Sequence, residues 1–294
     1  MKKYISLFFA LWVALTSCGK DDDDKKQEIP QLNKLTKVTC IKSNSPSSVP
    51  EFVLTVTYNQ DRQIAKITHD GKDTDIFTYN NTSQLIVNSF ASENSASPTL
   101  AKKMNYLLSG GGIVKSEEHL HNTYKSDEEY LANIYSFSYN RNNLAGCSWD
   151  EANWPKEDGS GYENRKIMET GSYTWENNNM VLYKKGTKEM AFTYKSELQS
   201  ETFPLHFVNT FHPIAVNTVS PLNFYFGNRN RNLVETISIY ELPDVSNLHA
   251  KYAFSYNTTG EYVTGMTVTE EIFPAGEQTA TTNTYSYSFE YNYK

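Results

Sequence analysis

The stretch from Cys147 to Gly159 holds the side chains best suited to binding a ligand. Two tryptophans lie there within six residues, with acidic, amide and lysine side chains around them. An indole ring can stack on a sugar ring, and carboxylates and amides can bind its hydroxyl groups. Alternatively, the first tryptophan packs in the core and the second covers one end of the fold. We predict a ligand-binding loop with the candidate residues Trp149, Asp150, Trp154 and Asp158.

Glu117, His119 and His121 would share one face of a β-strand, because alternate residues of a strand point to the same side. Imidazole and carboxylate groups are metal ligands, so this spacing could hold a metal ion. The neighbouring Glu118 and Asn122 are instead typical of a solvated strand end. We therefore predict no metal site.

The chain lacks the common catalytic and nucleotide-binding motifs. It contains no G-x-S-x-G sequence, no P-loop and no dinucleotide fingerprint. Adjacent carboxylates such as Glu270 and Glu271 would point to opposite faces of a strand, whereas a glycosidase needs two that face each other. We expect no catalytic residue and no cofactor. Three functions stay open: a binding module for a glycan or a partner protein, a carrier of an apolar ligand in a half-open barrel, and a hydrolase with an unrecognised carboxylate site.

Cys18 has the setting of a lipid-modified residue. A charged start is followed by an apolar stretch of eleven residues that ends at Leu15, too short to span a bilayer and typical of a signal peptide. The sequence Leu15-Thr16-Ser17-Cys18 resembles a bacterial lipobox. Residues 1–17 are therefore predicted to be removed, and acylation of the Cys18 thiol would hold the protein on a membrane.

Residues 18–29 form a charged spacer behind this cysteine. The run from Asp21 to Asp24 resembles the export signal of lipoproteins displayed on the cell surface. We expect an outer-membrane protein at the cell surface, the alternative being the periplasmic face of that membrane. In such an oxidising compartment Cys40 and Cys147 could form a disulfide, or they remain as buried thiols.

Composition limits the fold and the partners. Of 294 residues, 38% are hydrophobic and 14% aromatic, the mean hydropathy is −0.59 and the formal net charge is −7. Such low hydropathy excludes a bundle of membrane helices, and so many aromatic residues exclude a disordered chain. A mildly acidic chain without basic clusters is not expected to bind nucleic acid.

Alternating aromatic and polar residues predict an all-β fold. From Tyr285 to Tyr293 every second residue is aromatic, and the residues between are polar. This period of two places the aromatic rings on one face of an antiparallel strand. Transmembrane barrels carry their apolar face outward, whereas here we expect the aromatic face to turn inward. The prediction is a single antiparallel meander of hairpins, forming a curved, closed or half-open barrel-like sheet that is not inserted in the membrane.

A degenerate repeat recurs along the chain. Its unit is an apolar residue, a small polar residue, an aromatic residue and commonly Asn, followed by turn residues and another apolar run. Each unit predicts a β-hairpin, because its two large residues share one face and Asn tolerates turn geometry. The units begin at Val56, Phe77, Phe137, Tyr173, Phe192, Phe254 and Phe289.

Two segments are ambiguous within this pattern. Residues 97–109 form either a helix or a strand, and the strand is favoured because three glycines then separate two short apolar runs. The segment Phe203–Pro221 contains three prolines and is expected to be an irregular connection. No linker rich in Pro, Gly or Ser divides the chain, so residues 30–294 are predicted to form one domain.

The lipobox, the acidic run and the Phe-Thr-Tyr-Asn hairpins together resemble Bacteroidota surface lipoproteins that contain a domain of unknown function with a porin-like β fold. The hairpins also distantly resemble the Tyr-Asp repeats of bacterial shell-forming proteins, from which they differ by carrying Asn in place of Asp. The resemblance implies a location and a fold. It implies no catalytic residue.

Overall fold

The computed structural model describes residues 35–43, 50–71, 73–91, 99–110, 112–122, 125–156, 158, 160–165, 169–199, 227–241, 248–274 and 279–292. The predicted signal peptide, Cys18, the spacer and Phe203–Pro221 lie outside these ranges. The described regular structure is all strand: β1 (Leu35–Lys42), β2 (Phe52–Tyr58), β3 (Ile64–His69), β4 (Asp73–Asn81), β5 (Gln84–Ala91), β6 (Thr99–Ser109), β7 (Gly112–Asn122), β8 (Lys125–Asn140), β9 (Asn143–Pro155), β10 (Tyr162–Arg165), β11 (Glu169–Glu176), β12 (Asn179–Lys185), β13 (Lys188–Gln199), β14 (Asn232–Glu241), β15 (Leu248–Thr259), β16 (Tyr262–Ile272) and β17 (Thr281–Tyr291). None of the described residues belongs to a helix capable of crossing a membrane.

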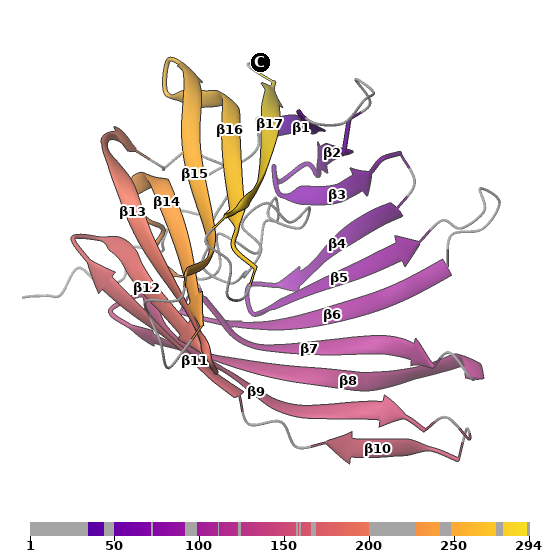
Figure 1. The fold of residues 1–294 in the computed structure, drawn as a ribbon. Helices are drawn as coiled ribbons and strands as arrows, with labels where there is room; N and C mark the ends of the chain where they lie inside the picture. Colours follow the sequence, from indigo (N-terminus) through magenta and orange to yellow (C-terminus); the bar gives the residue numbers. More distant parts are fainter. Residues whose placement is uncertain are drawn as a thin grey trace, which may run out of the picture.

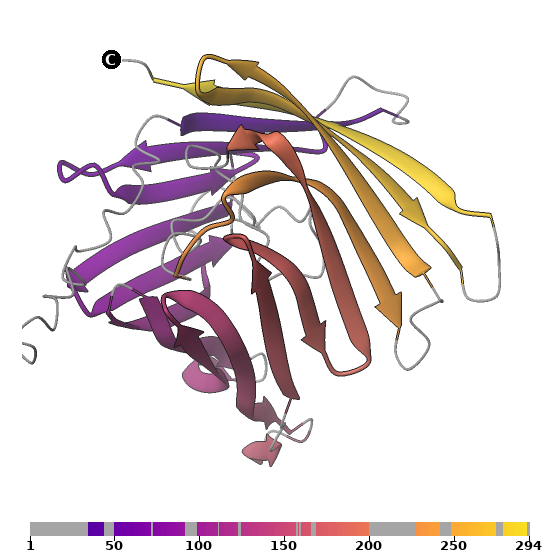
Figure 2. The same ribbon diagram turned by 90° about the vertical axis from the view of Figure 1, so that its left-hand side faces the viewer.

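Sixteen of the described strands pair in a closed antiparallel ring. Each strand pairs with the next along the chain, except that β9 pairs with β11, and β10 only extends the end of β9. The ring closes where β17 pairs with β1, so that Leu35 lies opposite Tyr291. In Figure 1, β15–β17 stand upright while β6–β9 lie across the page, and Figure 2 shows the same strong twist from the side. The structure confirms the predicted all-β barrel.

Apolar side chains point into the barrel. Leu85 and Val87 of β5 lie opposite Tyr106 and Met104 of β6, and the first three of these are buried. The residues between them face outward, as in β17, where Ser286 is exposed next to buried Tyr287. The inward face therefore carries the apolar core, as the alternation of the sequence predicts.

Seven aromatic side chains tie neighbouring strands together at one rim of the barrel. Each is the third residue of a repeat unit, and its hydroxyl or indole N–H donates a hydrogen bond to a backbone carbonyl near the start of the neighbouring strand. Tyr139, for example, donates to the carbonyl of Ile113 at 2.6 Å, and Gly112 makes room, since a Cβ there would lie 3.0 Å from the Tyr139 ring. We call this set the aromatic belt and this end the belt rim. The bonds run from Tyr58 to Leu35, Tyr79 to Ile64, Tyr139 to Ile113, Trp175 to Leu144, Tyr194 to Met180, Tyr256 to Val234 and Tyr291 to Val263.

Tight turns and a short strap complete the belt rim. Arg141–Asn142 and Asn177–Asn178 have positive φ at both positions, which is the geometry of a two-residue hairpin turn. Residues 227–232 cross both turns: the Asn228 N–H donates to the Asn142 carbonyl at 2.6 Å, and that of Arg231 to the Asn178 carbonyl at 2.9 Å. The strap packs so closely that a Cβ on Gly227 would lie 2.1 Å from the Asn142 oxygen.

Three further expectations can be compared with the structure. Thr99–Ser109 is strand β6, which confirms the strand alternative for this region. Cys40 and Cys147 are free thiols, and burial raises the pKa of Cys40 to about 11. Trp175, the third residue of the repeat unit that begins at Tyr173, packs against the core, on the face that the repeat predicts.

The belt predicts the stability of Tyr139→Phe. The substitution keeps the ring and leaves the Ile113 carbonyl without its donor, which costs about 1–3 kcal/mol when the group is removed from water. We expect the free energy of unfolding, measured by urea titration, to fall by that amount. Tyr240→Phe is the control, because the described residues offer the Tyr240 hydroxyl no hydrogen-bond partner, and a change within about 0.5 kcal/mol is expected. Equal effects of the two substitutions would refute a stabilising role for the belt.

Candidate functional site

Polar side chains line the inside of the barrel toward the end opposite the belt, which we call the far rim. The pairing register places them on the same inward face as the apolar core. They nevertheless keep part of their surface exposed: 17% for His69, 18% for Glu118 and 37% for Lys102. Solvent can therefore reach them. This inner polar band consists of His69, Asp75, Lys102, Glu118, Asn133, Trp149, Lys185 and Glu169.

One end of the band is an imidazole–carboxylate pair across β3 and β4. His69 Nε2 lies 3.0 Å from Asp75 Oδ2. Burial by itself would raise the pKa of Asp75, but hydrogen bonds with His69 and Ser89 and the charges of His69 and Lys102 outweigh it. The pKa of Asp75 therefore lies below its usual value, and the carboxylate is ionised at neutral pH.

Glu118 of β7 is the centre of the band. One of its carboxylate oxygens accepts a hydrogen bond from the Asn133 amide group, and the other lies 3.8 Å from Lys102 Nζ. The amide oxygen of Asn133 accepts a hydrogen bond from Trp149 Nε1 at 3.0 Å. Because both ends of the Asn133 amide are engaged, it fixes the positions of Glu118 and Trp149. Burial, together with the charges of Glu118 and Glu169, raises the pKa of the neighbouring Tyr135 to about 12.

Trp149 is held on both sides by neighbouring strands. Its ring stacks on Tyr135 of β8, with centroids 6.0 Å apart, and Lys185 Nζ of β12 lies 5.5 Å from its centroid. Lys185 is also held by Glu169 at 3.1 Å. A sugar stacking on this indole would have to displace one of these neighbours.

A second aromatic pair, which sequence reasoning missed, lies beside Glu118. Tyr130 of β8 and Tyr162 of β10 have ring centroids 4.9 Å apart at an interplanar angle of 32°, and both side chains are half-buried. Burial raises the pKa of Tyr130, and the nearby Tyr162 and Glu118 raise it further. Tyr130 lies on β8 and Tyr162 on β10, and both strands pair with β9. The contact between the two rings therefore follows from strand register and not from the sequence repeat.

The segment from Trp149 to Gly159 was predicted to be a loop, and this is wrong as far as Pro155. β9 runs to Pro155 and pairs there with β10, which begins at Tyr162. Proline is tolerated because it occupies the last position of the strand, where the extension of the ladder ends. Asp158 is exposed in the turn, and hydrogen bonds with the Ser160 side chain and backbone N–H lower its pKa. The side chains of Asp150 and Trp154 lie outside the described part of the structure.

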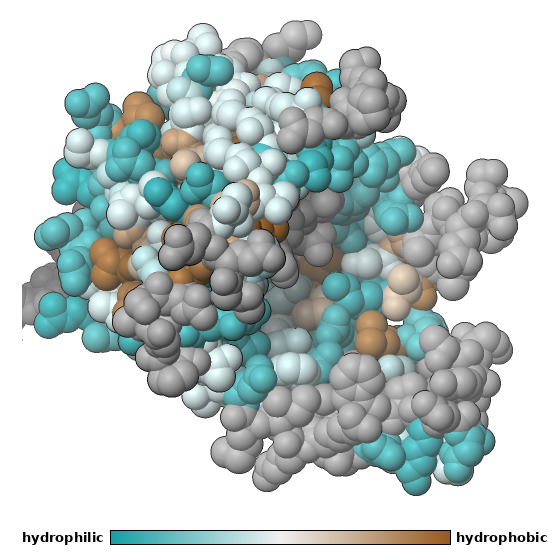
Figure 3. All heavy atoms as spheres, viewed as in Figure 1, coloured by the Kyte–Doolittle hydropathy of each residue, from teal (hydrophilic) through white to brown (hydrophobic). Residues whose placement is uncertain are grey.

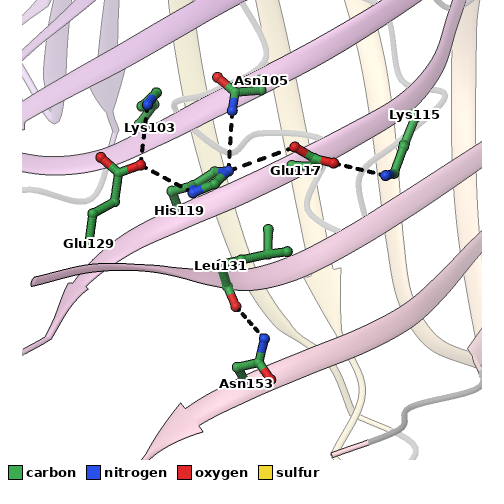
Figure 4. A network of polar contacts seen from close by, with 8 residues as sticks. All are labelled: Lys103, Asn105, Lys115, Glu117, His119, Glu129, Leu131 and Asn153. Carbon is green, nitrogen blue, oxygen red and sulfur yellow. Dashed lines mark hydrogen bonds and ion pairs between the residues drawn. The ribbon is translucent and has the colours of Figure 1, made fainter. Parts of the chain in front are cut away.

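The group around His119, considered above as a possible metal site, lies on the outer face of β6, β7 and β8 (Figure 4). His119 Nδ1 lies 3.2 Å from Glu129 Oε1, and its Nε2 lies 3.8 Å from Glu117 Oε2 and accepts a hydrogen bond from Asn105 at 3.2 Å. Lys103 also contacts Glu129, and Lys115 contacts Glu117 at 2.8 Å, a hydrogen bond that lowers the pKa of Glu117. The two carboxylates lie on opposite nitrogens, and no group of metal ligands converges among the described residues. These contacts instead link β6, β7 and β8.

A third polar group lies on the inward face of β15–β17. Glu270 is buried, and it accepts hydrogen bonds from Asn283 Nδ2 at 2.9 Å and from the Tyr285 hydroxyl at 3.3 Å. Burial and the Glu270 charge raise the pKa of Tyr285 to about 12. This carboxylate is therefore held in place by neutral donors.

Figure 3 shows that the face seen in Figure 1 is hollowed, with hydrophilic and hydrophobic residues side by side around the depression.

A family model described as Domain of unknown function (DUF5032) matches residues 19–294. The chain belongs to this family. No curated protein matches it. Among solved structures, this DUF5032 chain is similar to a porin-like protein from Bacteroides uniformis ATCC 8492, with a TM-score of 0.58 and 14% sequence identity over 87% of this chain and 96% of that chain. At this identity the likeness shows the fold alone: a porin-like β-barrel.

Asp75 predicts an acid-sensitive stability for the DUF5032 barrel. Since its pKa is lower in the folded than in the unfolded chain, the unfolded chain binds more protons as the pH falls, and the free energy of unfolding decreases below the usual carboxyl range of about pH 4. We expect Asp75→Asn to weaken this pH dependence in urea titrations between about pH 6 and about pH 3. Asp61→Asn, in the exposed turn after β2, is the control. An unchanged slope for Asp75→Asn would show that the pair does not contribute.

Proposed function

We propose that the protein is an outer-membrane lipoprotein, displayed on the cell surface, whose barrel stands outside the bilayer and binds a ligand without catalysis at its far rim. The polarity of the barrel wall is the observation that carries the proposal. A transmembrane barrel presents an outward apolar band about 25 Å tall. Here outward positions such as Thr57, Ser172 and Ser286 are polar and exposed.

Exposed apolar side chains do not form such a band. In the part of the chain that the structure describes, the only large exposed ones are Ile41, Ile76 and Leu107. They belong to β1, β4 and β6, which are not neighbours in the ring. The wall is therefore suited to water on the outside.

The positions of the chain ends support a defined orientation. β1 begins at Leu35 and β17 ends at Tyr291, both at the belt rim. A spacer from an acylated Cys18 would therefore reach the barrel at this rim. The far rim, which carries the inner polar band, would then face away from the membrane. The hairpin of β9 and β10, with Trp149, Asp150, Trp154 and Asp158, belongs to this rim and to the proposed site.

The His69–Asp75 pair favours a second candidate function, a hydrolase. An imidazole oriented by a carboxylate can act as a general base for a nucleophile or a water molecule. Ser89, the nearby hydroxyl, hydrogen-bonds with Asp75 and so stands on the wrong side of the pair to be activated by His69. We therefore propose binding as the primary function.

Membrane attachment through Cys18 is tested by Cys18→Ala expressed in the native host. Without the thiol there is no thioether to carry the lipid, so we expect the protein to move from the membrane fraction to the soluble fraction. Labelling with radioactive palmitate should be lost in parallel. A variant that still pellets with membranes and still incorporates palmitate would overturn the anchor.

The exposed position of the barrel predicts the behaviour of the unacylated mature chain. Because the outward wall is polar, the chain that starts at residue 18 and carries Cys18→Ala should stay in solution without detergent and show a β-type circular dichroism spectrum. It should also produce no conductance steps in planar bilayers. A need for detergent, or porin-like steps, would contradict the proposal.

A further inference from the structure

We infer that the far rim recognises a neutral saccharide at a corner formed by Tyr130, Tyr162, Glu118 and Lys102. The inference rests on the proposed binding function and names its site and its ligand class. The corner lies on the inward face of β6, β7 and β8, with Tyr162 supplied by β10.

The aromatic pair provides the surface for a sugar ring. Tyr130 and Tyr162 are tilted against each other at 4.9 Å and remain half-buried, so part of each ring is accessible. Rings in this state present apolar area together with a hydroxyl group. A pyranose has matching C–H faces and peripheral hydroxyls. Trp149 is a poorer candidate, because Tyr135 and Lys185 already cover it.

Glu118 and Lys102 provide the polar contacts next to this surface. Register places Lys102 opposite Leu120, and Leu120 opposite Tyr130, so the three form a cross-strand row on β6, β7 and β8. Glu118 is two residues from Leu120 and on the same face. Because Leu120 lies directly opposite Tyr130, Glu118 and Tyr130 are diagonal neighbours across β7 and β8.

The distance between Glu118 and Lys102 favours a diol. At 3.8 Å, Lys102 Nζ and Glu118 Oε1 are too far apart for a closed hydrogen-bonded ion pair. Each retains hydrogen-bonding capacity, while Asn133 holds the other carboxylate oxygen of Glu118 in place. One sugar hydroxyl can donate to Glu118 Oε1, and the adjacent hydroxyl can accept from Lys102 Nζ.

The same pair indicates that the sugar is uncharged. Lys102 is compensated by Glu118 and by the ionised Asp75, so a neutral ligand leaves these charges balanced after binding. An acidic sugar would pair with Lys102 and leave Glu118 uncompensated, and an amino sugar would place a second cation beside Lys102. In a half-buried site, an uncompensated charge opposes binding.

The test uses the mature chain with Cys18→Ala and a panel of neutral oligosaccharides of defined sequence, with matched uronic-acid and amino-sugar oligosaccharides. We expect at least one neutral oligosaccharide to bind in an array and to be confirmed by calorimetry. Tyr162→Ala should weaken its binding by about tenfold, which is the scale of one lost aromatic contact. Tyr162→Phe should retain binding, because the ring surface is kept.

Tyr262→Ala is the matched control. Tyr262 forms a similar tilted aromatic pair with Tyr291, with centroids 5.1 Å apart, at the belt rim. This variant should bind like the unmodified chain, and thermal unfolding of all variants shows whether a loss of binding reflects a loss of folding.

Two results would overturn the inference. One is that no neutral oligosaccharide binds. The other is that Tyr162→Ala and Tyr262→Ala bind equally well. Binding confined to charged sugars would refute the neutral ligand class but keep a binding function, whereas membrane anchoring and solubility are judged by their own tests.

Discussion

A hydrogen bond from an inward aromatic side chain to a carbonyl at the start of the neighbouring strand is the interaction on which this barrel depends. Strand ends leave backbone groups without ladder partners, and a buried carbonyl without a donor is costly. In the belt, Tyr139 satisfies Ile113, and six other pairs repeat the arrangement. Each bond also fixes the offset between two strands. The belt therefore sets the register from which the positions of the core and of the inner polar band follow.

The long strands β6–β9 show how polar contacts replace a core toward the far rim. Beyond buried Tyr106 and Leu144, the inward face changes to Glu118, Asn133 and Trp149, which are held by hydrogen bonds. The outward face of the same strands carries the contacts around His119. Polar links on both faces hold the strands where apolar packing ends. They also hold charged groups in fixed positions on the inward face.

The sequence repeat predicted which residues form the belt and that they point inward. This was possible because the alternation of side chains along a strand and the preference of Asn for turns are local properties of the sequence. It did not predict the acceptor carbonyls, since these depend on the register between strands. Closure of the ring was also beyond local reasoning, because Leu35 and Tyr291 lie at opposite ends of the described chain. Trp149 was predicted to lie in a loop but belongs to β9, because pairing with β10 continues this strand to Pro155. Tyr162 was missed because a strand of four residues carries little periodic signal.

The central claim is that the barrel wall is polar outside and apolar inside, and that it stands clear of the membrane that carries its anchor. The most direct test is electron paramagnetic resonance of the acylated protein in native-lipid vesicles, with nitroxide labels at Ser172→Cys and Ser286→Cys in a Cys40→Ser, Cys147→Ser background. These two positions are exposed on the outward wall, on β11 and β17. We predict that a water-soluble nickel complex relaxes both labels more effectively than oxygen does. Stronger relaxation by oxygen at both positions would place the wall in lipid and contradict the account.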